Sequence, residues 1–173
     1  MTEIKDCLPA NTRKHFIDLR NIRLGVEIAR YQERVTQLRA QIAARNQGRS
    51  GWQEMEEWKC KEEFLNSLAT GYVQDAFETC RLYDIPLTQS ICDCLVKAVE
   101  ELLDVQYMHA LQAQGQGLGD VRVPLSVRQQ GNLPSRRIMP QIRVIIETAR
   151  VEDLKRSTSP SLSAMFDEPP PPS

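Results

Sequence analysis

Side chains suited to metal chemistry are few in this chain of 173 residues. The two histidines, His15 and His109, lie far apart, and neither has a second His or Cys at a metal-ligand spacing. Cys92 and Cys94 have one residue between them, whereas structural zinc sites usually place two to four. Residues two apart on a helix point about 200° apart, so these two thiols would not converge on one ion. We therefore predict no metal site.

The sequence also lacks the motifs that mark catalysis. It contains neither a G-x-S-x-G elbow nor a phosphate-binding G-x-x-x-x-G-K loop. The alternating glycines of 115–119 follow a helical pattern, whereas a dinucleotide site requires a preceding strand. Paired acids such as Glu62-Glu63 are better explained as solvated helix surface than as acid–base catalysts. We predict a non-enzymatic protein without cofactors, and an enzyme that uses Cys92 or Cys94 is a distant alternative.

The five cysteines occur at irregular spacings. An odd number without a repeating pattern does not favour a disulfide scaffold, so we expect a reducing compartment. We interpret Cys80, Cys92 and Cys94 as small, partly buried hydrophobic residues. The N-terminus has no basic segment followed by an apolar run, and no apolar stretch approaches 18 residues. We therefore exclude a membrane-spanning helix and expect a soluble, intracellular protein of the cytoplasm or nucleus.

A heptad repeat within residues 12–46 is the clearest pattern and predicts a long amphipathic, coiled-coil helix. With Val35 at heptad position a, Asn21 is the one polar residue of the seam, and a buried Asn at a fixes register and strand number. We predict self-association through this seam, as a dimer, although the seam can also close within the chain against 52–112. The residues expected to mediate association are Asn21, Leu24, Ile28, Tyr31, Val35, Leu38 and Ile42.

Two further helices are predicted in the middle of the chain, over about 52–83 and 88–112. Gly71 is expected to split the first of them into two helices. Pro86 ends this helical stretch, because the residue before a proline disfavours helix. The fold class is therefore mostly α, with a central helical hairpin or small bundle after the long N-terminal helix.

The end of the first central helix and the start of the second are similar to the helix-turn-helix of phage small-terminase-like and transposase-like regulators. The resemblance rests on residues 63–71, Ala76 and the stretch 83–91 (YDIPLTQSI). It implies that the helix after the turn is a DNA-recognition helix. That helix, over 88–103, carries only Lys97 against three acidic residues, with Asp104 directly after them, and phosphates repel such a surface. We therefore favour an antiparallel helical hairpin in a bundle.

The C-terminal third is predicted to be a Gly-rich hinge followed by a basic arm. Residues 121–127 alternate in polarity and predict a short extended segment at an edge. A loop is expected at 134–140 and a last helix over about 140–155, with a strand over the β-branched stretch 142–146 as the alternative. We divide the chain into an N-terminal basic helix at 1–50, an acidic hairpin at 51–113, a hinge and Arg-rich arm at 114–156, and a disordered Ser/Pro tail at 157–173.

Charge is segregated along the chain even though its formal net charge is −1. Residues 1–50 hold 10 basic and 5 acidic side chains, residues 51–113 hold 4 and 12, and residues 114–173 hold 8 and 6. Such asymmetry fits docking of basic on acidic segments, head-to-tail assembly, a polyanionic partner, or merely solvated faces. The candidate contacts to nucleic acid are Arg122, Arg128, Arg136, Arg137 and Arg143.

Three apolar residues in the tail, Leu162, Met165 and Phe166, are followed by two acids and form a candidate docking element. Taken together, the sequence predicts a non-enzymatic assembly or adaptor protein that self-associates through its N-terminal helix and binds an unidentified protein partner. The alternative is a nucleic-acid-binding regulatory or packaging protein that uses the helix-turn-helix-like hairpin and the Arg-rich arm.

Overall fold

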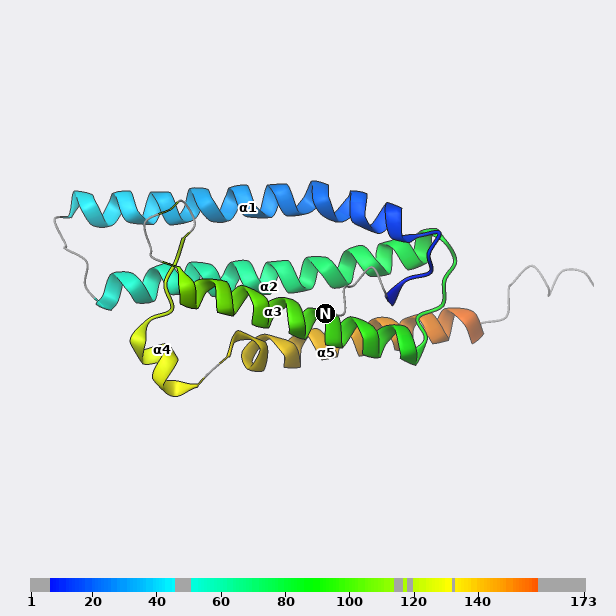
Figure 1. Ribbon diagram of the computed structural model, residues 1–173. Coiled ribbons are helices and arrows are strands. Elements are labelled where there is room, and N and C mark those ends of the chain that lie inside the picture. The colour runs from blue at the N-terminus through cyan, green and yellow to red at the C-terminus, as the bar shows by residue number, and fades with distance from the viewer. Residues whose placement is uncertain (1–6, 46–50, 114–116, 118–119, 132, 159–173) are drawn as a thin grey trace, which may run out of the picture.

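The computed structural model describes residues 7–45, 51–113, 117, 120–131 and 133–158. Five helices occur in these ranges, and Figure 1 shows them in chain order. They are α1 (Arg13–Ala44), α2 (Gly51–Leu82), α3 (Gln89–Gln112), α4 (Leu125–Gln130) and α5 (Pro134–Thr158). The predicted mostly α class is confirmed, as are the long N-terminal helix and the helical hairpin that follows it.

The helix α2 lies in the middle of the molecule, with α1 along one side and with α3 and α5 along the other (Figure 1). Extensive contacts join α1 to α2, α3 to α5, and α2 to both α3 and α5. Among the described helices, α1 therefore has one main neighbour, whereas α2 has three. This arrangement leaves both flanks of α1 accessible.

Two hydrophobic cores hold the bundle together. The larger one is formed by α2, α3 and α5, and residues of the segment before α1 also belong to it. Fully buried members such as Leu65, Leu95 and Ile142 lie at its centre. The smaller one surrounds Trp58 and joins α1, α2 and α3 to the segment that carries Val121 and Val123. Burying such side chains is the main favourable term in folding a helical bundle.

Three boundaries predicted from the sequence are wrong. First, α2 runs through Gly71 without a break. Second, residues 121–127 form no strand, because a short helix begins at Leu125. Third, α5 begins at Pro134 and contains Pro140, so the expected loop at 134–140 is helical. A proline is well tolerated at the start of a helix, and burial of the neighbouring Ile138, Met139 and Ile142 favours continuing through the second one.

Close packing explains why Gly71 lies inside α2. A Cβ atom added to Gly71 would lie 2.7 Å from Nη1 of Arg20 and 2.7 Å from Oε1 of Glu27. Both atoms belong to a hydrogen-bonded ion pair at the α1–α2 interface, so they have little freedom to move. Glycine is therefore needed at this position for the close approach of α1 rather than for a helix break.

The turn between α2 and α3 has the geometry of a Schellman motif. The Ile85 N–H donates to the Cys80 carbonyl at 2.8 Å, and Asp84 has a φ of 52°, in the left-handed region. After the turn, the Thr88 hydroxyl accepts a hydrogen bond from the Ile91 N–H at 3.3 Å and caps α3. The turn thus joins two antiparallel helices, as the hairpin interpretation predicts.

Replacing Asp84 with glycine is expected to stabilise the protein by about 0.5–1 kcal/mol, because glycine adopts a positive φ without the penalty of a Cβ atom. The Asp84 side chain is exposed, so its removal sacrifices no buried contact. Chemical denaturation of both proteins would measure the difference. Asp93→Gly, inside α3, is the matched control and should destabilise by a similar amount; an unstable Asp84→Gly protein would contradict this account of the turn.

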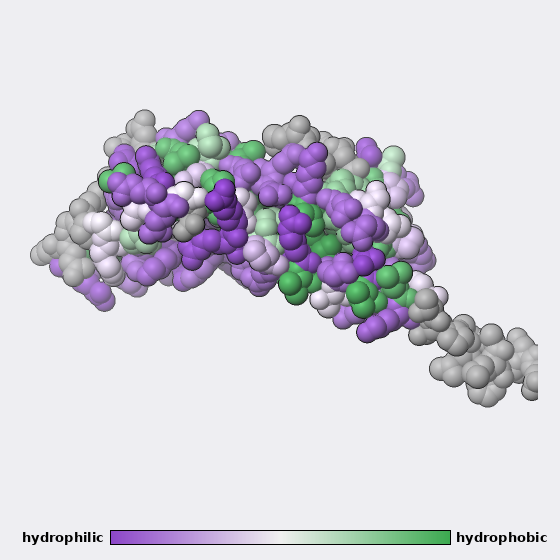
Figure 2. All heavy atoms as spheres, turned by 90° about the horizontal axis from the view of Figure 1, so that it is seen from below, coloured by the Kyte–Doolittle hydropathy of each residue, from purple (hydrophilic) through white to green (hydrophobic). Residues whose placement is uncertain are grey.

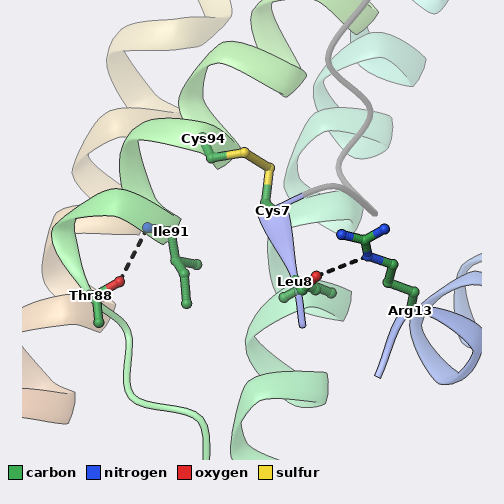
Figure 3. Close-up of a disulfide and its surroundings, with 6 residues drawn as sticks. All are labelled: Cys7, Leu8, Arg13, Thr88, Ile91 and Cys94. Carbon is green, nitrogen blue, oxygen red and sulfur yellow. Dashed lines mark hydrogen bonds between the residues drawn. A yellow bond between two sulfur atoms is a disulfide. The ribbon is translucent and has the colours of Figure 1, made fainter. Parts of the chain in front are cut away.

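A disulfide joins Cys7 to Cys94, so Cys94, which the sequence suggested was a small hydrophobic residue, is covalently paired. Figure 3 shows the bond linking the segment before α1 to α3, with Leu8 beside it. The Arg13 Nε donates to the Leu8 carbonyl at 3.0 Å and holds the same segment from the other side. The pairing was missed because its two residues are 87 apart in sequence and meet only in the folded chain.

The other described cysteines are buried and free. This confirms the interpretation of Cys80 and Cys92 as buried hydrophobic residues, and Cys94 departs from it. Burial raises the pKa of the Cys80 thiol to about 11, and it also raises the pKa values of Cys60 and Cys92. Such thiols are protonated at neutral pH and are poor nucleophiles.

Candidate interaction surfaces

The heptad seam of α1 is used largely within the chain. Val35 is fully buried against α2, and Tyr31 and Ile42 are also buried. Leu24 and Leu38 are half-buried, whereas Ile28 and Asn21 are exposed. The seam therefore closes against α2 as the sequence allowed, and its N-terminal half, including Asn21, stays on the surface of the single chain.

Buried charges reinforce the contact between α1 and α2. Arg20 is 3% exposed and donates to Asp75, which is fully buried, at 3.2 Å. A second bond of 2.7 Å runs from Arg20 to Glu27, and the Tyr72 ring lies 4.2 Å from the Arg20 guanidinium carbon. Arg23 also donates to Asp75. Burial alone would lower the pKa of Arg20, but the bonds to Glu27 and Asp75 outweigh it and raise that pKa.

At the other end of α1, Arg39 ties three elements together. Its guanidinium donates to both carboxylate oxygens of Glu57, at 3.1 and 2.9 Å. It also donates to the carbonyls of Gly117 and Asp120, at 2.9 and 2.7 Å. These carbonyls belong to the connection between α3 and α4, so Arg39 positions this connection beside the smaller core. Sequence analysis assigned no role to Arg39.

An apolar groove lies on the α3 flank of α1 and has α2 as its floor. It encloses about 260 Å³, and Ile28 forms part of its rim with 37% of the side chain exposed. Its described lining residues are Leu24, Ile28, Tyr31, Gln32, Lys61, Phe64, Leu68, Tyr72, Leu102 and Gln106. We refer to this feature as the apolar groove.

Lys61 is the one charged residue among the described residues that line the apolar groove. Its ammonium lies 5.3 Å from the centre of the Tyr31 ring and 5.1 Å from that of Phe64, and it donates to Gln106 at 3.4 Å. No carboxylate of the described residues forms a salt bridge with Lys61. Burial lowers the pKa of this ammonium, and the more distant Asp120 only partly opposes the effect.

A larger polar cleft lies on the opposite flank of α1, where Gln141 of α5 contributes to its wall. It encloses about 570 Å³ and contains the ion pair between Arg34 and Glu63. The Asn66 side-chain oxygen is buried at this cleft without a hydrogen-bond partner. The two flanks of α1 therefore differ in character, since one is apolar with a single cation and the other is lined by amides, hydroxyls and paired charges.

The predicted Arg-rich arm is a full helix of the bundle, and several of its arginines bond within the chain. Arg137 pairs with Glu62 of α2 at 2.7 Å, and Arg143 lies 3.9 Å from Glu100 of α3. Arg128 donates to the Val123 carbonyl at 2.9 Å. Arg137 and Arg143, like the arginines of α1 that pair with α2, thus contact the acidic segment within the chain, whereas Arg128 bonds within its own segment.

All five candidate nucleic-acid contacts are exposed, and Arg122 and Arg136 form no salt bridge within the described residues. None of these five arginines lies on α3, and Glu100 of α3 pairs with Arg143. The structure thus brings Arg137 to α2 and Arg143 to α3.

Large hydrophobic side chains are exposed on every described helix, and they are most numerous on α1 and α5. On α1 they are Ile17, Ile22, Val26 and Ile28. On α5 they are Val144, Val151 and Leu154. Figure 2 shows that one face of the molecule is mainly hydrophilic, with apolar side chains gathered towards the end where the C-terminal trace leaves. An unpartnered apolar stripe on a helix is typical of a contact with another protein.

The described residues contain no group of three or more His, Cys, Asp or Glu side chains that could hold a metal ion. Across those same ranges, every helix is either too short or too polar to cross a bilayer. Cys94 is unavailable as a thiol nucleophile in the disulfide-bonded protein, and Cys92 is buried. The tail element, with Leu162, Met165 and Phe166, lies outside the described residues.

No protein family, curated protein or solved structure matches this chain. Its function is therefore argued from the surfaces described above.

Proposed function

We propose that this protein is a non-enzymatic helical assembly or adaptor protein that self-associates through α1. The main support is the arrangement of α1, which has one main neighbour, α2, among the described helices. Its exposed isoleucines, Ile22 at 72% and Ile28 at 37%, lie on the part of the helix where the heptad seam is least covered. Pairing with a second copy would remove this apolar surface from water.

Burial of the C-terminal half of the seam refines the proposal. Tyr31, Val35 and Ile42 hold α1 on α2 and present a pre-formed helix, so association need not first order this element. Asn21 and Ile28, which are exposed, are then the seam residues available to a second chain. A short polar side chain within an otherwise apolar contact favours one register.

A double substitution of two exposed apolar residues on one face of α1, Ile22→Glu with Val26→Glu, is expected to convert the associated protein to monomer. Placing carboxylates in an apolar contact imposes a desolvation cost that the contact cannot offset. Light scattering on a size-exclusion column, over a range of protein concentrations and at low and high salt, would measure the mass.

The matched control is Val144→Glu with Val151→Glu, which places the same charges on exposed apolar positions of α5. This variant should keep the mass of the unmodified protein. A full-length protein that is monomeric at every concentration would overturn the proposal. A mass that rises only when nucleic acid is added at low salt would instead favour a nucleic-acid-binding protein that uses Arg122 and Arg136.

A further inference from the structure

The apolar groove has the features of a binding site for an apolar segment that carries an acid. Aromatic and aliphatic side chains from three helices line it, and Ile28 leaves its rim open to solvent. Lys61 contributes a positive charge over the Tyr31 and Phe64 rings and lacks a carboxylate partner among the described residues. A partly buried ammonium is stabilised when a carboxylate approaches it, so the groove favours an apolar occupant with a negative charge at one end.

The chain itself contains a segment with this chemistry. Residues 159–173 are the longest stretch outside the described ranges, and within it Leu162, Met165 and Phe166 are spaced as i, i+3 and i+4. This spacing places three apolar side chains on one face of a single helical turn, which is the pattern of helix-in-groove recognition. Asp167 and Glu168 follow directly and supply carboxylates.

The length of the chain determines which copy can supply this segment. Helices α3 and α5 are antiparallel, because Asp153 bonds to the Leu87 N–H while Arg143 lies beside Glu100. Leu102 therefore lies about 22 Å along α3 from the level of Asp153, and the end of α5 at Thr158 extends about 7 Å in the opposite direction. The segment must thus span about 30 Å along the bundle to reach the groove.

The tail of the same chain is too short for that distance. Leu162 is four residues beyond Thr158 and can reach at most about 14 Å, and Phe166 can reach at most about 29 Å when fully extended. Neither value includes the detour around α3 to its α1 side. The occupant must therefore come from another molecule.

We infer that the apolar groove binds the segment 162–168 of a second copy of this chain, with Asp167 or Glu168 against Lys61. This contact rests on the proposed self-association and would be the second contact between the two copies, in addition to that of α1. Because the two chains are identical, each can supply its tail to the groove of the other in a closed, two-fold dimer. Pro169 limits the docked turn at its C-terminal end, since proline does not continue a helix.

The test uses full-length protein, and sedimentation velocity measures the dimer dissociation constant. Lys61→Gln is expected to weaken the dimer about tenfold or more, because it removes the charge that the acids meet in a poorly solvated site. The matched control is Lys59→Gln, two residues away on α2, where the lysine is exposed and pairs with Glu56. Asp167→Asn with Glu168→Gln should weaken the dimer to the same extent as Lys61→Gln, and the combination should add little.

The tail variants change residues beyond the helices that form the two cores, so they test the inference even if Lys61→Gln disturbs folding. A mixing experiment then distinguishes exchange between copies from any contact within one chain. A chain with Lys61→Gln keeps an intact tail, and a chain with Phe166→Ala keeps an intact groove. Their mixture should contain heterodimers that are tighter than either homodimer, because one intact tail–groove contact is restored.

Each contrary result has a definite meaning. If the full-length protein associates but the Lys61, Asp167 and Phe166 variants behave like the unmodified protein, this inference is overturned and the proposed function stands. If mixing restores nothing although each variant is weakened, the tail does not exchange between copies and the inference fails. A full-length protein that never associates overturns both.

Discussion

Replacing Asp75 with alanine is expected to lower the free energy of unfolding by about 3–5 kcal/mol. Asp75 is fully buried and receives hydrogen bonds from both Arg20 and Arg23. Its removal leaves Arg20, itself 3% exposed, with Glu27 as its remaining acidic partner among the described residues. The cost is that of an incompletely compensated charge in a site that excludes water. Chemical denaturation followed by circular dichroism would measure it.

The control for this prediction is Glu78→Ala. Glu78 is also bonded to Arg23, at 2.8 Å, but its side chain is 53% exposed and that of Arg23 is 42% exposed. Solvent screens such a pair, so its loss should change stability by no more than about 1 kcal/mol. If the two substitutions lowered the free energy of unfolding equally, burial of the Arg20–Asp75 pair would not determine how much this pair contributes to stability.

A double substitution refines the same experiment. Arg20→Met with Asp75→Leu replaces the buried pair by apolar residues of similar length and should recover much of the lost stability, as replacements of buried ion pairs often do. Recovery would show that the single substitution acts through the orphaned charge rather than through lost packing.

Removal of the Cys7–Cys94 disulfide is expected to have an effect of similar size. The bond closes a loop between residues 87 apart, and the chain-entropy estimate for a loop of this length is about 4–5 kcal/mol. The loss comes mainly from greater freedom of the unfolded chain. We expect the double variant Cys7→Ser with Cys94→Ser, and the reduced natural sequence, to unfold at clearly lower denaturant concentration.

The folded state should also change locally when this bond is absent. Leu8 is 2% exposed and Thr12 is fully buried, so the segment before α1 covers the larger core. Hydrogen exchange should increase first in this segment and at the adjacent start of α3. Reductant should leave the stability of the double variant unchanged, which controls for effects on other thiols. An identical unfolding midpoint for oxidised and reduced natural protein would contradict the prediction.

Local patterns were enough to predict most of the helices. The heptad repeat located α1, and Pro86 with Thr88 located the turn between α2 and α3, because both signals act through backbone and side-chain contacts a few residues apart. Predictions failed where local propensity and packing disagree. Gly71 and Pro140 are helix breakers by propensity, but close approach of Arg20 at the first and burial around the second favour a continuous helix.

The sequence shows that basic and acidic residues are segregated along the chain, but it does not show which groups these charges contact. A net excess of basic residues before and after an acidic segment permits docking within the chain, assembly between chains or binding of a polyanion. Only distances between charged atoms in the folded chain distinguish these outcomes for individual ion pairs. They show that Arg137 pairs with Glu62 and that Arg39 pairs with Glu57. The apolar groove was likewise invisible, because its lining comes from helices that are distant in sequence.

The sequence by itself determined that the chain is helical, where α1 lies and that one stripe of it is apolar, because these properties follow from spacing within a few turns. Only the tertiary structure decided that α2 covers the C-terminal half of this stripe, that Cys7 meets Cys94, and that Arg20 and Asp75 share a buried site. Those contacts join residues 55 or 87 positions apart. Such pairings depend on how whole helices pack, and no local pattern specifies them.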